Sequence, residues 1–154
     1  MKLYLIQHGE AAPEEVDSAR PLTAKGRSDV QKIASFLKGA GVRPGAILHS
    51  GKTRARQTAE IISAQLGPDC QVREREGFAP NDPVTALIKE ISGMADDLMI
   101  VGHLPFLGKL ASLLIAGSES KNLVVFRQGG VVCLQRTEGQ TWQVAWMVTP
   151  ELLP

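Results

Sequence analysis

The stretch Leu3-Tyr4-Leu5-Ile6-Gln7-His8-Gly9-Glu10 places a histidine directly after the first apolar run of the chain. The run is short and contains β-branched and aromatic residues, so it predicts a buried strand, and the polar step with a glycine behind it predicts the turn that ends the strand. In open α/β sheets, ligands bind outside the carboxyl ends of the strands. We therefore expect His8 to lie exposed at such a site. Taken alone, the fragment fits a histidine that merely caps a strand equally well.

Length and composition describe an ordinary globular chain. The 154 residues are 44% hydrophobic and 21% charged, so we expect one domain, residues 1–154. A formal net charge of +1 predicts no broad basic surface and argues against nucleic acid or an anionic membrane as the main partner. Cys70 and Cys133 form no CxxC or Cys/His pattern, which is typical of reduced thiols in the cytoplasm. No apolar run approaches the ~20 residues of a membrane helix. We expect a monomer.

Apolar runs and helical periodicities alternate along the chain, which predicts a three-layer α/β sandwich with a mostly parallel sheet and helices on both faces. The expected strands are 3–6, 46–49, 71–74 and 98–101, and the expected helices are 24–39, 53–66, 84–91 and 105–115. The closing segments 123–126, 130–134 and 142–148 look β-like, so we expect antiparallel additions at one edge.

Polar, chemistry-bearing residues follow two of the other expected strands. Arg54 comes in the first turn of the helix after strand 46–49, and His103 follows strand 98–101. If these strands are parallel neighbours of the first, both residues converge with His8 at one edge of the sheet. Helix N-termini, arginine and imidazole together make a site for an anion, most naturally phosphate. Each residue also has a purely structural alternative. Arg54 could pair with Glu60 on an exposed helix face, and His103 could form a hydrogen bond to a backbone carbonyl.

Two other kinds of site find no support in the sequence. The pattern GxxxxGK[ST] is absent, so a phosphate-cradling P-loop is not expected. The three histidines have no partner at metal-ligand spacing, and His49, at the end of an apolar strand, fits a packed structural histidine. We expect neither a metal nor a cofactor.

Four segments resemble the histidine phosphatase superfamily. They are "QHGE" at 7–10, "RPLT" at 20–23, "SGKTRARQTA" at 50–59 and "GHLP" at 102–105, and their order and spacing fit its small SixA-type phosphohistidine phosphatases. The resemblance implies the fold of that superfamily and a metal-independent phosphatase that acts through a phosphohistidine intermediate in signal transduction. It implies a phosphorylated protein, carrying phosphohistidine, as the partner.

The resemblance also assigns roles to residues. His8 matches the nucleophile that takes the phosphoryl group, Arg54 matches the arginine that holds the phosphate, and His103 matches the second histidine that faces it. Arg20 matches a further phosphate-binding arginine of the small members. One position departs from the pattern. The usual motif reads Arg-His-Gly, whereas this chain has Gln7, whose amide can donate a hydrogen bond to phosphate but supplies no charge.

The departure at position 7 and the uncertain general acid leave alternatives open. Asp82 or Glu76 could protonate a leaving oxygen, whereas an imidazole leaving group needs less help. The chain could instead hydrolyse a small phosphate ester as a phosphomonoesterase. It could also be a catalytically weak module that binds phosphate or phosphohistidine because of Gln7.

Overall fold

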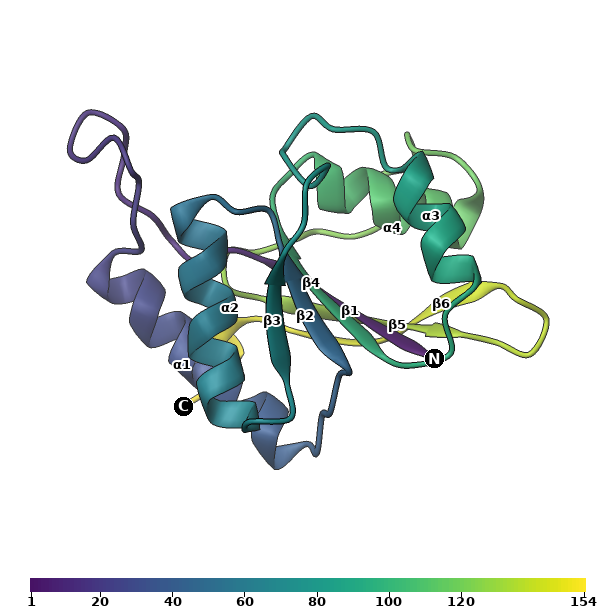
Figure 1. Ribbon diagram of the computed structural model, residues 1–154, viewed down its shortest axis with the longest axis horizontal. Helices are drawn as coiled ribbons and strands as arrows, with labels where there is room; N and C mark the ends of the chain where they lie inside the picture. The colour runs from purple at the N-terminus through teal and green to yellow at the C-terminus, as the bar shows by residue number, and fades with distance from the viewer.

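The computed structural model describes residues 1–154 and contains a six-stranded sheet in the order β3-β2-β4-β1-β5-β6 (Figure 1). The neighbouring pairs β3·β2, β2·β4 and β4·β1 are parallel, whereas β5 and β6 add antiparallel strands at one edge. The mostly parallel sheet with an antiparallel edge is therefore confirmed. The strands are β1 (Lys2–Gln7), β2 (Ala46–His49), β3 (Gln71–Glu74), β4 (Leu98–Gly102), β5 (Val131–Arg136) and β6 (Trp142–Val148).

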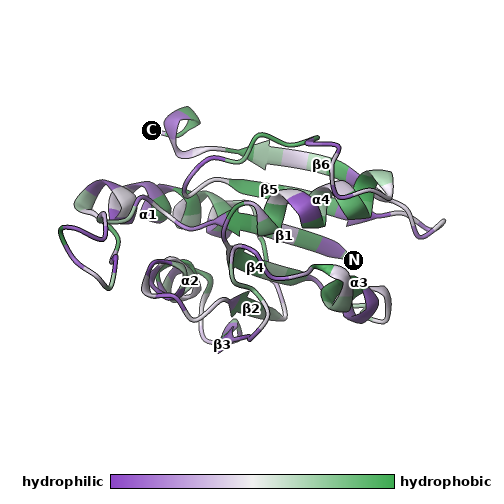
Figure 2. Ribbon diagram, turned by 90° about the horizontal axis from the view of Figure 1, so that it is seen from above, coloured by the Kyte–Doolittle hydropathy of each residue, from purple (hydrophilic) through white to green (hydrophobic).

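Helices cover both faces of the sheet, as Figures 1 and 2 show from two directions. Helices α1 (Ala24–Gly39) and α2 (Thr53–Leu66) lie together on one face. Helices α3 (Thr85–Ser92) and α4 (Phe106–Ala116) lie on the other, and a short 3₁₀ helix, η1 (Pro150–Leu152), follows β6. The expected three-layer sandwich is confirmed. No helix combines the length and the apolar character needed to cross a membrane.

The first strand is buried on both faces because a helical layer covers each of them. Tyr4 and Ile6 belong to the hydrophobic core beneath α1 and α2, and Leu3 and Leu5 belong to the core beneath α3 and α4. Each fully buried aliphatic side chain contributes about 1.5–3 kcal/mol of transfer free energy. The strand is thus a rigid support, and it carries His8 one residue beyond its carboxyl end.

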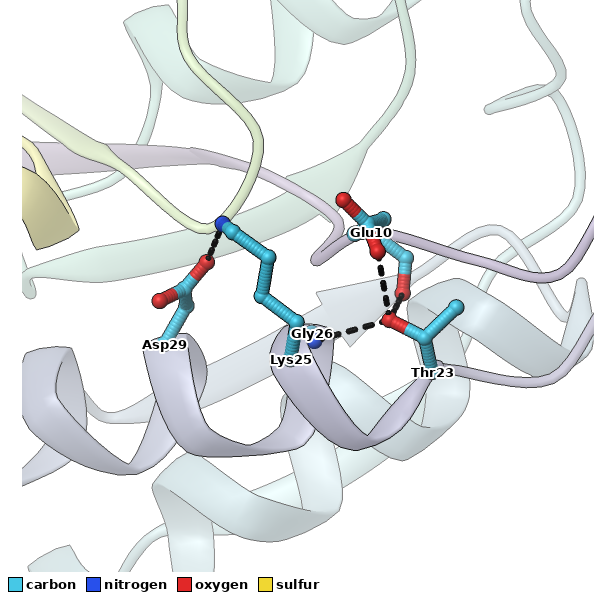
Figure 3. Close-up of polar contacts among 5 residues, drawn as sticks. All are labelled: Glu10, Thr23, Lys25, Gly26 and Asp29. Atoms are coloured by element: carbon cyan, nitrogen blue, oxygen red, sulfur yellow. Dashed lines mark hydrogen bonds and ion pairs between the residues drawn. The ribbon is translucent and has the colours of Figure 1, made fainter.

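The loop that follows His8 lies directly on the start of α1 (Figure 3). Thr23 is the N-cap: its hydroxyl accepts the Gly26 N–H at 2.9 Å and donates to the Glu10 carboxylate at 2.9 Å. A Cβ at position 26 would lie 2.1 Å from the Glu10 carbonyl oxygen, so only glycine permits this close approach. The exposed Lys25–Asp29 ion pair in the same view contributes little to stability.

One expected strand is wrong. Residues 123–126 form no strand, and residues 122–126 make no backbone hydrogen bond within the chain. The apolar, β-branched composition of this segment is typical of a strand. A strand forms, however, only where a neighbouring strand is available for pairing. Here β1 already pairs on both sides, with β4 and β5, and β5 pairs on both sides, with β1 and β6. Residues 123–126 therefore cannot pair with β1 or β5, and they do not join the free outer side of β3 or β6 either.

Candidate active site

The carboxyl ends of three parallel strands meet at one edge of the sheet. Gln7 pairs with Gly102 across β1 and β4, and His49 pairs with Val101 across β2 and β4. The residues that follow these strands, His8, Ser50 and His103, therefore emerge side by side. The structure brings together all three residues that the sequence predicts as catalytic, His8, Arg54 and His103.

His8 is buried, with 7% of its surface exposed, so the expectation of an exposed strand-end histidine is wrong. The helix α1 packs against the following residue so closely that a Cβ at Gly9 would lie 2.8 Å from a methyl of Val30. The His8 Nδ1–H donates to the Gly9 carbonyl at 2.7 Å, and the Gly9 N–H donates to the Thr58 hydroxyl at 3.1 Å. These bonds fix the ring and leave Nε2 as the nitrogen with the free lone pair.

Arg54 is the nearest cation to that nitrogen. It lies in the first turn of α2, and its Nε–H donates to His8 Nε2 at 3.3 Å. No carboxylate pairs with its guanidinium, so the alternative in which Glu60 neutralises Arg54 on the surface is wrong. Arg56, two positions on, is exposed. The terminal NH₂ groups of Arg54 are thus available to an anionic ligand.

Arg20 approaches the same place from the loop before α1. Burial is the largest cause that lowers the pKa of His8 and of Arg54, and the positive charge of Arg20 adds to both shifts. The Arg20 Nε–H donates to the Ala12 carbonyl at 3.2 Å. The backbone of Arg20 has φ +49°, a left-handed conformation that costs a non-glycine residue energy. The loop therefore holds Arg20 in a specific, unfavourable conformation, and no carboxylate neutralises its charge.

His103 faces His8 with the ring centroids 5.0 Å apart. Its Nε2 lies 2.6 Å from the Ser50 hydroxyl oxygen, which also accepts the Lys52 N–H at 3.4 Å. The Ser50 oxygen accepts from Lys52, so we assign its own hydrogen to the contact with Nε2 and the ring proton of His103 to Nδ1. That Nδ1 is the only buried side-chain nitrogen or oxygen of the chain without a hydrogen-bond partner. A buried donor without a partner is costly, which indicates that a ligand supplies one.

Both histidines are neutral at neutral pH. Burial is the largest cause that lowers the pKa of His8 to about 4; its bond to the Gly9 carbonyl opposes this shift, and the charges of Arg54 and Arg20 add to it. Burial also lowers the pKa of His103 to about 3, helped by His8 and the surrounding cations. The site therefore combines two guanidinium charges with an unprotonated imidazole nitrogen, which suits it to bind an anion and attack it.

Two glutamines complete the surroundings. Gln7, the last residue of β1, is half-buried, and its side-chain amide makes no hydrogen bond within the chain. The Gln57 side-chain oxygen accepts the Leu22 N–H at 2.8 Å and so ties α2 to the loop that carries Arg20. Gln7 is thus free to donate to a ligand, and Gln57 holds the loop in place.

The candidate general acids are not hydrogen bonded to the site. Asp82 accepts the Ala79 N–H at 2.8 Å within its own loop, and Glu76 is exposed. The Glu10 carboxylate is held by the Thr23 hydroxyl. His49 is a packed structural histidine, as expected: it is 4% exposed and its Nδ1 accepts the Gly51 N–H at 3.1 Å.

Sequence reasoning assigned no role to Ser50 or Thr58, although both lie within the quoted segment 50–59. Thr58 follows Arg54 by one helical turn on the buried side of α2, and Ser50 directly follows β2. A polar residue among the buried alanines of a helix was a signal that could have singled out Thr58. The role of Ser50 depends on a contact between residues 53 positions apart, which no local pattern reveals. No cluster of three or more His, Cys, Asp or Glu side chains is arranged to hold a metal ion.

Comparisons with known proteins agree with this geometry. A model of the histidine phosphatase superfamily (branch 1) matches residues 3–79. An uncharacterized protein of Picosynechococcus sp. is 36% identical over 143 residues, 88% of this chain and 85% of its own length. The phosphohistidine phosphatase SixA of Escherichia coli (strain K12) is 24% identical, with 97% of this chain and 94% of that protein covered. The solved structure of the protein histidine phosphatase SixA complexed with tungstate superposes with a TM-score of 0.85 at 25% identity, over 99% of each chain.

Proposed function

Because the chain belongs to the histidine phosphatase superfamily and is of its SixA type, we propose that it is a phosphatase that hydrolyses protein phosphohistidine through a phosphohistidine intermediate on His8. The observation that carries the proposal is the pairing of a neutral His8 Nε2 with two guanidinium groups that no carboxylate neutralises. Tungstate, bound in the related SixA structure, is a tetrahedral oxoanion like phosphate.

In the first step, the lone pair of His8 Nε2 attacks the phosphorus and the bond to the leaving group breaks. The Arg54 Nε–H leaves Nε2 and turns to the phosphoryl oxygens, where Arg20 also donates. Gln7 adds a neutral donor, and the Nδ1–H of His103 gains the acceptor that it lacks in the free protein. Phosphoryl transfer depends on this kind of positioning and charge neutralisation. The leaving group departs with the electron pair of the broken bond and takes up a proton from solvent water.

In the second step, water attacks the phosphorus and the phosphorus–Nε2 bond breaks. The electron pair returns to Nε2, and the water supplies the hydroxyl group and one proton of the released phosphate. The bond from His8 Nδ1–H to the Gly9 carbonyl persists throughout, because it lies on the far side of the ring from the reacting nitrogen. That bond stabilises the positive charge that the ring carries while it is phosphorylated.

A phosphohistidine substrate makes the smallest demand on a general acid, a role that the hydrogen bonds of the free protein assign to no carboxylate. Neither Asp82 nor Glu76 is hydrogen bonded to His8, Arg54 or His103. An alkoxide leaving group needs a general acid to protonate it, whereas an imidazole leaves more readily. A site of this kind favours a phosphorus–nitrogen bond over an alkyl phosphate ester. We further propose that the chain works as a single domain and a monomer in the cytoplasm, where its two free, buried cysteines stay reduced.

A second candidate follows from Gln7. A pocket with one positive charge fewer than the family pattern could bind phosphohistidine without turning it over, because the loss of one transition-state donor costs about 2.7–4 kcal/mol. Arg20 argues against this candidate, since it brings a second unpaired guanidinium to the site.

The test compares two substrates with a chelator present throughout. Purified protein is incubated with a phosphotransfer domain phosphorylated on histidine and with an aryl phosphate, and released phosphate is measured. We expect turnover of both, with a higher kcat/KM for the phosphohistidine domain. Tight binding of the phosphorylated domain without release of phosphate would support the binding module. Activity that needs an added divalent ion would contradict the metal-independent mechanism.

A further inference from the structure

Residues 122–126, which we call the unpaired segment, have the sequence of a strand and no partner strand. After Asn122, whose φ of +49° is left-handed, the segment reads Leu-Val-Val-Phe, a composition enriched in strands. None of its backbone N–H or C=O groups is hydrogen bonded within the chain. Its side chains alternate, with Leu123 and Val125 exposed, Val124 half-buried and Phe126 buried, which is the period of two of an extended backbone. Such a row of free backbone groups is a template for another strand.

Exposed apolar surface accompanies these free backbone groups. Leu123 is 51% exposed and Val125 is 66% exposed, among the most exposed large apolar side chains of the chain. A cavity of about 480 Å³ separates the segment from the start of α4, with Val124 and Phe126 on one side and Leu104 and Pro105 on the other. Leu104 is itself 41% exposed. Apolar side chains of an added strand would pack against these residues, and this packing would remove apolar surface of both partners from water.

The groove lies next to the candidate active site. Leu104, which lines it, directly follows His103. At the other side, the chain continues from Phe126 to Gly129, whose N–H donates to the carbonyl oxygens of Gln7 at 2.9 Å and His8 at 3.2 Å. A peptide on the unpaired segment would thus lie beside the catalytic edge without occupying it.

The charged residues around the unpaired segment determine which kind of peptide fits it. The segment is flanked by Lys121 and Arg127, both exposed, and the cavity itself is lined by Lys109 and Glu119. Arg127 also lines a neighbouring hollow, in which Lys25 and Lys32 lie with Asp29 and Glu151. A second copy of the chain fits poorly, because antiparallel pairing about Val124 would place Lys121 opposite Arg127. Like charges directly opposite one another destabilise a strand pair. The flanking cations favour a strand with acidic residues at its ends.

We propose that the unpaired segment docks an extended segment of a partner protein, apolar at alternate positions and acidic at its ends, which adds to residues 123–126 as a β-strand. Backbone hydrogen bonds supply the affinity, and the cavity and the flanking cations supply the specificity. The proposal does not depend on the chemistry assigned to His8, because the docked strand touches none of the residues that bind phosphate.

The test is a titration of the ¹⁵N-labelled protein with the synthetic peptide Glu-Asp-Val-Thr-Val-Thr-Val-Asp-Glu, followed by backbone amide NMR. We expect shifts and slowed hydrogen exchange confined to residues 119–127 and the start of α4. Val125→Asp, which places a negative charge on the exposed apolar row, should weaken binding by about tenfold or more. Val16→Asp is the matched control, since Val16 is 76% exposed in a different loop, and it should bind as the unaltered protein does.

Other results would overturn the proposal. These are the absence of shifts at residues 122–126 at millimolar peptide, equal binding by Val125→Asp, or equal binding of a peptide with lysines in place of its acidic residues. Shifts of the same amides with protein concentration alone would show a second copy as the occupant. Aryl phosphate hydrolysis should proceed at the same rate with and without saturating peptide. Competitive inhibition would place the peptide in the catalytic site and contradict the inference.

Discussion

Ser50 Oγ lies 2.6 Å from Nε2 of His103, so a hydroxyl from the end of β2 holds the imidazole that follows β4. The contact orients the imidazole of His103, and with the ring proton assigned to Nδ1 that buried nitrogen is a donor without a partner in the chain. Ser50 is therefore a positioning residue: it acts on phosphate through His103.

Ser50→Ala should lower kcat by about five- to tenfold, because a neutral hydrogen bond of this kind is worth about 1 kcal/mol. Ser50→Thr, which keeps the hydroxyl, should restore most of the activity. The tautomer of His103, measured by ¹⁵N NMR of the imidazole, should be uniform in the unaltered protein and mixed in Ser50→Ala. A purely structural role for Ser50 would lower stability while leaving the tautomer unchanged.

Arg20→Ala tests whether this arginine supplies charge to the phosphate. We expect kcat/KM to fall by on the order of 10²-fold or more, as for a lost transition-state donor. Arg56→Ala is the matched control, because Arg56 is exposed on α2 near the site and should leave kcat/KM unchanged. An Arg20→Ala variant with full activity would show that Arg20 merely anchors its loop through Ala12.

Gln7→Arg restores the charge that the family pattern has at this position. Since the amide of Gln7 makes no hydrogen bond within the chain, the substitution breaks no existing hydrogen bond, and a guanidinium can donate two charged hydrogen bonds. Inhibition by inorganic phosphate should become about tenfold or more tighter, and turnover of substrates with poor leaving groups should rise. Unchanged phosphate inhibition would mean that position 7 does not reach the ligand.

The two buried histidines should make the unfolding free energy of the protein decrease in acid. Their pKa values, about 4 for His8 and about 3 for His103, are below the ordinary 6.5, so the unfolded chain binds more protons than the folded one between these values. The stability that the two neutral histidines contribute is fully present above pH 6.5, and it decreases as the pH falls towards 4. At pH 5 the contribution of each histidine to the unfolding free energy of the protein should be about 2 kcal/mol smaller than at neutral pH.

The measurement is the unfolding free energy from urea titrations at pH 7 and pH 5, compared between the unaltered protein and His103→Asn. The variant should lose about 2 kcal/mol less between the two pH values, because it lacks one of the two groups. An equal loss in both proteins would show that His103 has an ordinary pKa. Imidazole NMR should show His8 neutral at pH 6, with its proton on Nδ1.

Much of the fold could be predicted because its signals are local. The continuous apolar run of β1, the Thr23 cap and the helical periodicities each depend on a few neighbouring residues. The segment 123–126 shows the limit: its composition is that of a strand, but whether a strand pairs depends on which edge of the sheet is free. The burial of His8 could not be predicted either, because it results from α1 packing against Gly9.

The site could be predicted as far as motifs and strand ends allow. The expected order of parallel strands predicts that His8, Arg54 and His103 meet at one edge of the sheet, and the structure brings them together there. The contacts that tune them were not predictable, since Thr58 and Ser50 act across separations of 49 and 53 residues. The general acid remained open in the sequence, and hydrogen bonding shows that Asp82 is engaged within its own loop.

The central claim, transfer of the phosphoryl group to His8 Nε2, is tested most directly by trapping the intermediate. The protein is mixed with a ³²P-labelled phosphohistidine domain, quenched in alkali after milliseconds and digested for mass spectrometry. We predict an acid-labile, alkali-stable label on His8 that forms and decays at rates compatible with kcat, with neither label nor turnover in a folded His8→Ala variant. Turnover by His8→Ala at the rate of the unaltered protein, or a label on another residue, would contradict the account.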